Sequence, residues 1–149
     1  MFPLGGRAGD KTVAEIDGWN LSGKEMALNT DHGSESIRAA ALEGKEGLSN
    51  LVNYAVDGME ECLESEPNES MEQAQAIELP RMLNGRIDKA GDVDVYRVEG
   101  RAGDAIVAEV YGRRLRSPID SLVRVLDADG GVLAYNDDFV DKDGHLHRI

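Results

Sequence analysis

Hydrophobic and polar residues alternate in several short stretches of the chain, a pattern typical of strands with one buried face. The alternation is clearest at 49–57 and 92–100. It recurs at 82–88, which holds the Asn84-Gly85 hairpin signal, and at 105–112, 121–130 and 132–138, each bounded by Gly, Asp or Pro. No βαβ unit is visible. The pattern therefore predicts an all-β fold of the antiparallel sandwich or jelly-roll type.

The secondary structure of two stretches is less clear from this pattern. In residues 31–48, Ile37, Ala39 and Ala41 alternate as in a strand, although the alanine content also suits a short helix, and we favour the strand. Ser70 and Gln73 fit a capping box ahead of MEQAQAI, which predicts a short helical turn near residues 71–77 before Pro80 ends it.

One phrase occurs twice, as GRAGDKTVAEIDG at 6–18 and GRAGDAIVAEVYG at 100–112. Each copy reads as a Gly-Asp turn that feeds a strand, with Gly9 and Gly103 supplying the backbone freedom of the turn. One interpretation of the repeat is that both copies use a common way of starting a strand. The more specific interpretation is that the chain contains a pair of related β-modules.

An acidic, proline-containing stretch at 58–70 is the best domain boundary in the chain. It predicts a first β-module at 1–57, a linker at 58–70 and a second β-module at 71–149. Because the chain has only two Phe and one Trp, the cores of both modules must rest on aliphatic side chains.

Charge narrows the classes of partner. The chain has 29 acidic and 16 basic residues and a net charge of −13, which opposes binding to nucleic acid and to anionic lipid and favours divalent cations. The N-terminal residues lack the pattern of a signal peptide, and no window is apolar enough to insert into a membrane.

The search for catalytic chemistry is negative: no nucleophile elbow, zinc-protease motif or phosphate loop is present. We therefore predict no enzyme activity. Cys62 is the only cysteine and is interpreted as incidental. The acidic run at 136–144 fails as an EF-hand, because Phe139 would occupy the first ligand position. His145 and His147 alternate, but no third metal ligand has convincing spacing.

Calcium is the best chemical candidate, because this hard cation takes six to eight oxygen ligands. Asp92 and Asp94 are two residues apart in a predicted strand, so both side chains can point the same way. Further oxygen ligands lie on the linker, at Glu64, Glu66, Asn68 and Glu69. The competing interpretation is a solvated acidic linker beside a polar turn.

Residues 64–138 resemble the bacterial pre-peptidase C-terminal domain. The resemblance rests on ESEPNES (64–70), MEQAQAI (71–77), LNGRIDKAGDVDVYRVEG (83–100), RAGD (101–104), RRLRSPIDSLVRVLDADG (113–130) and LAYNDD (133–138). It implies a small jelly-roll sandwich appended to secreted proteases and other large exported proteins. The family usually continues with further strands after the NDD, so we expect the module here to be incomplete.

In the collagen-binding members of that family, an acidic linker folds back against the GD-x-D strand to bind calcium. The resemblance therefore implies the same role for the six candidate ligands Glu64, Glu66, Asn68, Glu69, Asp92 and Asp94. This sequence departs from the family pattern at Glu69, where Asp is commoner in the family.

Residues 3–57 look like an immunoglobulin-like module of the IPT/TIG type. The residues that carry this resemblance are PLGGRAGDKTVAEIDGWNL (3–21) and SNLVNYAV (49–56). Because the match starts at the beginning of the sequence, we expect this module to lack its first strand. Together the two resemblances imply an interior piece of a longer multi-domain protein that is secreted or lies in the cell envelope.

The function that these resemblances imply is a non-catalytic accessory module, stabilised by calcium, that stabilises or targets its parent protein. Its expected partners are the other domains of that parent and an extracellular polymer such as a protein fibre or a polysaccharide. An open sandwich edge also predicts dimerisation through an edge strand. The alternative is a part of a secreted protease that contributes to its substrate site.

Overall fold

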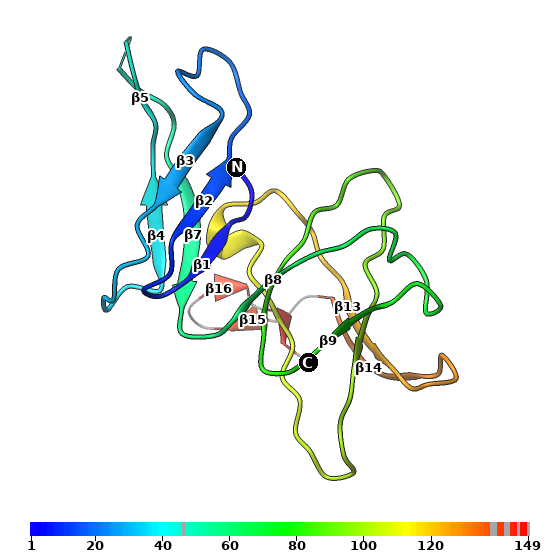
Figure 1. Ribbon diagram of the computed structural model, residues 1–149. Helices are drawn as coiled ribbons and strands as arrows, with labels where there is room; N and C mark the ends of the chain where they lie inside the picture. Colours follow the sequence, from blue (N-terminus) through cyan, green and yellow to red (C-terminus); the bar gives the residue numbers. More distant parts are fainter. Residues whose placement is uncertain (46, 138–139, 142–143, 146, 149) are drawn as a thin grey trace. The chain divides into compact units, whose positions relative to one another are not determined.

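The computed structural model describes residues 1–45, 47–137, 140–141, 144–145 and 147–148 (Figure 1). These residues form short strands and one 3-10 turn, with no α-helix among them, which confirms the predicted all-β, sandwich-like fold class. The chain divides into two compact units, residues 1–99 and 100–149. Each unit is considered by itself below.

The first half of unit 1 contains a three-stranded sheet and two hairpins. Its strands are β1 (Gly5–Arg7), β2 (Thr12–Glu15), β3 (Glu25–Leu28), β4 (Ile37–Ala40), β5 (Glu43–Gly44), β6 (Gly47–Leu48) and β7 (Val52–Asp57). The sheet has the order β1-β7-β4, with β1 parallel and β4 antiparallel to β7. β2 with β3 and β5 with β6 form antiparallel hairpins. The strand that we favoured within 31–48 is thus confirmed as β4.

The hydrophobic core of unit 1 lies between the β2–β3 hairpin and the sheet. Ala14, Leu28, Tyr54 and Val56 are all buried there. The hydroxyl group of Tyr54 donates a hydrogen bond of 3.0 Å to the carbonyl oxygen of Asn29, so the only polar atom of this side chain is satisfied. The core is small and mainly aliphatic, as the composition predicts.

The second half of unit 1 is built from parallel pairs of strands. The strands are β8 (Glu61–Leu63), β9 (Gln75–Ile77), β10 (Met82–Asn84) and β11 (Tyr96–Val98). β8 pairs in parallel with β10, and β9 pairs in parallel with β11. The antiparallel arrangement predicted for this region is therefore wrong, and Asn84-Gly85 ends a strand without forming a hairpin.

The helical turn predicted near 71–77 is confirmed only at its start, because β9 occupies residues 75–77. A single turn forms, in which the amide of Gln73 donates to the carbonyl of Ser70 and the two side chains are 3.2 Å apart. The chain then becomes extended, because Gln75 donates to the carbonyl of Val95 and begins β9. The capping residues thus close one turn, and strand pairing overrides any longer helix.

Unit 2 contains β12 (Glu109–Val110), the 3-10 turn η1 (Arg113–Leu115), β13 (Val123–Leu126), β14 (Val132–Asn136), β15 (Val140–Asp141), β16 (Gly144–His145) and β17 (His147–Arg148). Its pairs β12–β17, β13–β14 and β15–β16 are antiparallel. The longest is the β13–β14 hairpin, where the sequence predicted two successive strands.

The repeated phrase forms the same turn in both places. The amide of Asp10 donates to the carbonyl of Arg7, and the amide of Asp104 donates to that of Arg101. Gly9 and Gly103 have φ values of 87° and 95°, a region that side chains with a Cβ rarely adopt. The copies differ afterwards, since β2 begins at Thr12 whereas the strand of the second copy begins only at Glu109.

The linker predicted at 58–70 lies within unit 1, and three of its residues form β8. The division of the chain at that linker stays a prediction.

We expect Leu28→Ala to lower the free energy of unfolding by about 2–4 kcal/mol, because Leu28 is 6% exposed and packs in the core. Leu48→Ala is the matched control, since Leu48 is 74% exposed, and it should change the free energy by less than about 0.5 kcal/mol. Urea unfolding measures both. Equal losses in the two variants would contradict this core.

Candidate metal centre

Three carboxylates come together in the part of unit 1 that follows β8. Glu64, Glu66 and Asp94 each place one oxygen so that all three oxygens lie within 4.8 Å of one another. Two oxygens bound to one calcium ion at about 2.4 Å can be at most about 4.8 Å apart. The three side chains are therefore spaced as ligands of a single cation would be.

Backbone hydrogen bonds hold the linker loop against the segment that carries Asp94, just before β11. The amide of Val95 donates to the carbonyl of Asn68 at 2.8 Å, and the amide of Gln75 donates to the carbonyl of Val95 at 3.0 Å. The loop is also folded on itself, because the amide of Asn68 donates to a carboxylate oxygen of Glu66 at 3.0 Å. Asn68 and Val95, which are 27 positions apart in the sequence, thus become neighbours.

Asn68 has the most buried large side chain at this site, with no exposed surface. Its amide nitrogen donates to Oε1 of Glu64 at 3.2 Å. Its Oδ1 has no hydrogen-bond donor among the residues that the structure describes. A buried polar atom without a partner costs free energy, on the order of 1–3 kcal/mol, and a cation beside it would remove that cost.

Asp92 and Asp94 each bury a further oxygen that lacks a donor within the described part of the chain. The side chain of Asp92 is 1% exposed, and its other oxygen accepts a hydrogen bond of 2.8 Å from the amide of Asp88. Lys89 Nζ is 3.8 Å from the first oxygen, beyond hydrogen-bonding distance. One oxygen of Asp94 and one of its neighbour Asp92 are therefore kept from water.

This crowding changes the acidity of Asp94. Burial raises the pKa of Asp94 to about 7, and a hydrogen bond with Glu64 and the negative charge of the neighbouring carboxylates act in the same direction. A bound divalent cation would have the opposite effect, because it favours the charged form of each ligand.

Tyr96 and Gly85 complete the surroundings of Glu64, and the sequence analysis missed both. The hydroxyl group of Tyr96 donates to Oε1 of Glu64 at 3.2 Å. Burial, followed by the negative charges of Asp94 and Glu64, raises the pKa of Tyr96. A Cβ at Gly85 would lie 3.1 Å from the Tyr96 hydroxyl oxygen and 3.2 Å from Oε2 of Glu64, so only glycine fits without a shift.

Of the six predicted ligands, Glu69 is directed elsewhere. Its carboxylate contacts Lys89 Nζ at 2.7 Å, and this hydrogen bond lowers the pKa of Glu69. The structure brings together Glu64, Glu66 and Asp94, and the buried Oδ1 of Asn68 has no hydrogen-bond donor among the described residues. Asp92 lies outside this three-carboxylate group. Whether these residues bind a metal stays a prediction.

A second buried carboxyl group, Glu61 in β8, lies close to the N-terminal strand. Asn84 donates a short hydrogen bond to its Oε2, and Asn84 Oδ1 accepts a hydrogen bond of 3.2 Å from the amide of Leu4. Burial raises the pKa of Glu61 to about 7, the hydrogen bond from Asn84 opposes this, and the charge of Asp57 adds to it.

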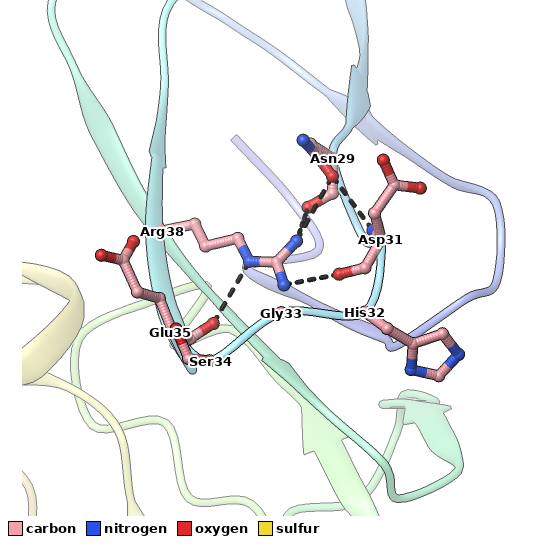
Figure 2. Close-up of a pocket in the computed structure, with 7 residues that line it drawn as sticks. All are labelled: Asn29, Asp31, His32, Gly33, Ser34, Glu35 and Arg38. Atoms are coloured by element: carbon pink, nitrogen blue, oxygen red, sulfur yellow. Dashed lines mark hydrogen bonds between the residues drawn. The ribbon is translucent and has the colours of Figure 1, made fainter.

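A separate hollow on unit 1 is lined by Asn29, Asp31, His32, Gly33, Ser34, Glu35 and Arg38 (Figure 2). The Arg38 guanidinium group lies across it and donates to the carbonyl oxygens of Asn29, Asp31 and Glu35, at 2.8, 2.6 and 3.2 Å. Through these bonds the Arg38 side chain holds the loop at residues 29–35 in place. We therefore interpret the hollow as a structural clamp.

The remaining sequence candidates add no site. Cys62 lies in β8, half-buried, and its sulfur accepts a hydrogen bond of 3.4 Å from Gln75. The acidic run at 136–144 includes residues outside those that the structure describes, and the side chains of His145 and His147 are not described either.

Comparison with known proteins links part of the chain to a protease. Over 91 residues it is 40% identical to a probable subtilase-type serine protease of Deinococcus radiodurans. The match covers 59% of this chain and 12% of that protease, so the chain spans a small part of its relative. No family model and no solved structure matches the chain. No helix in the described ranges is long and apolar enough to cross a membrane.

In the ion-free protein, we expect Glu61 to make stability fall as the pH rises from about 4.5 to 7. The folded state holds the Glu61 proton more tightly than the unfolded state in that window, so the contribution is present below it and lost above it. Glu61→Gln should be about 1 kcal/mol more stable than the wild type at pH 8, a value reduced because solvent screens a half-exposed group.

Urea unfolding at pH 5 and pH 8, with a chelator present, measures this difference. Glu78→Gln is the control, because the Glu78 side chain is 95% exposed. If the Glu61 and Glu78 variants show the same pH dependence as the wild type, the assignment to Glu61 is wrong.

Proposed function

We propose that the chain is a non-catalytic accessory module of a larger secreted or envelope protein and that it binds one calcium ion. The observation that carries the proposal is the group formed by Glu64, Glu66 and Asp94, whose oxygens lie within 4.8 Å of one another. A further buried oxygen without a donor, on Asn68, supplies an additional ligand from the same loop, and Asp92 adds negative charge next to Asp94. Together they approach the six to eight oxygens that calcium takes, with water completing the shell.

The chemistry of the ligands selects the kind of metal. All the candidate side chains offer oxygen alone, whereas zinc and copper sites in proteins are built mainly from nitrogen and sulfur ligands. Magnesium requires a nearly ideal octahedron and keeps several waters, which fits poorly with ligands held by loop backbone and buried side chains. Calcium tolerates irregular geometry and a high carboxylate count.

The accessory role rests on the similarity to a subtilase-type protease over a small part of that protein. A module attached to a secreted protease would meet extracellular calcium, and sites of modest affinity, with dissociation constants on the order of 0.1–1 mM, are common in extracellular modules. Its partners in this proposal are the other domains of the parent and an extracellular polymer such as a protein fibre or a polysaccharide.

A second candidate function is favoured by the same comparison: the chain contributes to the substrate site of a secreted protease. The two proposals differ in what they require. An accessory module folds and binds calcium without a catalytic domain, whereas a substrate-site element raises affinity for a peptide only when the catalytic domain is present.

We expect about 10 mM calcium to raise the melting temperature of the wild-type chain, because a ligand at 10 to 100 times its dissociation constant adds about 1.4–2.7 kcal/mol to the free energy of unfolding. Glu66→Gln and Asp94→Asn should each lose most of this shift, since each removes a negative ligand. Differential scanning calorimetry with millimolar calcium and with a chelator measures it.

Glu72→Gln is the matched control, because Glu72 is an exposed glutamate of the same segment outside the three-carboxylate group. It should keep the whole shift. A wild-type melting temperature that calcium leaves unchanged would overturn the calcium proposal, and equal losses in the control would show that the effect is not specific to the site.

A further inference from the structure

The candidate metal centre is connected to the N-terminal segment by residues 84–86. Asn68 and Tyr96 donate to Oε1 of Glu64. The other oxygen, Oε2, accepts a hydrogen bond of 2.6 Å from the backbone amide of Arg86. The Arg86 guanidinium carbon lies 3.8 Å from the centre of the Phe2 ring. One of its nitrogens is 3.8 Å from a carboxylate oxygen of Glu15.

A second connection runs through Asn84, two residues before Arg86. The amide of Glu64 donates to the carbonyl of Asn84 at 2.9 Å, and the Asn84 side chain accepts from the amide of Leu4 at 3.2 Å. The backbone of residues 84–86 therefore contacts Glu64 on one side, while its side chains hold Phe2 and Leu4 on the other. These contacts all lie within unit 1.

The contacts that the Arg86 side chain makes with Phe2 and Glu15 are individually weak. The ion pair of Arg86 with Glu15 is largely exposed, at 46% and 81%, so solvent screens it. The stacking of the guanidinium group on Phe2 contributes about 0.5–1 kcal/mol at such a site. Backbone hydrogen bonds also hold the N-terminal segment, in both directions between Phe2 and Glu15 at 2.9 and 2.8 Å, and from the amide of Ala55 to the carbonyl of Leu4 at 2.8 Å. The contacts from Arg86 and Asn84 add to this pairing, and through them the local opening of the segment can respond to a change at Glu64.

We infer that cation binding at Glu64 and docking of the N-terminal segment, residues 2–5, are coupled through residues 84–86. The inference rests on the proposed function, because it requires a cation at that site. A cation that takes Glu64 Oε1 fixes the carboxylate and leaves Oε2 to accept from Arg86. The loop at 84–86 is then held in the position from which Arg86 and Asn84 contact the segment.

Coupling of this kind is reciprocal: whatever factor calcium contributes to docking, docking contributes to calcium affinity. Arg86 is therefore a positioning residue of the metal centre although its side chain lies outside it. Loss of the Arg86 side chain should weaken calcium binding without removing any ligand.

Amide hydrogen exchange of the full chain, with calcium and with a chelator, tests the coupling. We expect calcium to slow exchange at Leu4 by at least about fivefold in the wild type, the lower end of measured couplings. Arg86→Ala should reduce this effect at Leu4, where the connection through Asn84 remains, and should weaken calcium affinity, measured by competition with a chromophoric chelator. Exchange at Val95, whose amide donates to Asn68, should still slow with calcium in the variant.

Arg81→Ala is the matched control, because Arg81 is another surface arginine in an ion pair, with Glu60 at 2.6 Å. It should change neither quantity. Phe2→Leu removes the aromatic ring but leaves Arg86 in place, and it should reproduce the reduction at Leu4 even if the Arg86 variant unfolds.

The outcomes separate the two proposals. If the wild type binds calcium but exchange at Leu4 does not respond, or if both variants keep wild-type affinity, the coupling is wrong and the metal centre stands. If the wild type binds no calcium, the metal centre is wrong and the coupling falls with it.

Discussion

Buried oxygen atoms without hydrogen-bond donors are the constraint on which the second half of unit 1 depends. Asn68, Asp92 and Asp94 each hold such an atom within the described residues, and Asn68 is fully buried. Buried charge of one sign is tolerated only when something of the opposite sign compensates it. Protonation does this in part, because the pKa of Asp94 rises to about 7, and a divalent cation would do it more completely.

The rest of this region can be understood as the scaffold of that cluster. Parallel pairing of β9 with β11 places Gln75 beside Tyr96 and brings the start of β11 next to the linker loop. Gly85 lets the backbone approach Glu64 and Tyr96 more closely than any other residue would. Few apolar side chains are buried here, since the core of unit 1 lies with β2, β3 and β7, so polar contacts determine the local structure.

The sequence predicted strands correctly where the signal was local. Examples are the alternation at 49–57, where β7 forms, and the apolar runs bounded by turn residues, where β13 and β14 form. It missed parallel pairing, because Asn84-Gly85 favours a hairpin locally while the partner of β10 lies upstream, at β8. The meeting of Glu64 with Asp94 was implied by a family resemblance, since no local pattern predicts contacts across 30 residues. Tyr96 could have been found, because in the strand predicted at 92–100 it follows Asp94 at a spacing of two, which places both side chains on one face.

Isothermal titration of the chelator-treated wild-type chain with calcium tests the central claim most directly. The account predicts saturable binding with a stoichiometry of one, because the oxygens of Glu64, Glu66 and Asp94 surround a single position. Calcium that gives no saturable binding heat, together with unchanged spectra on addition of the ion, would contradict the account and leave the acidic loop as a solvated linker.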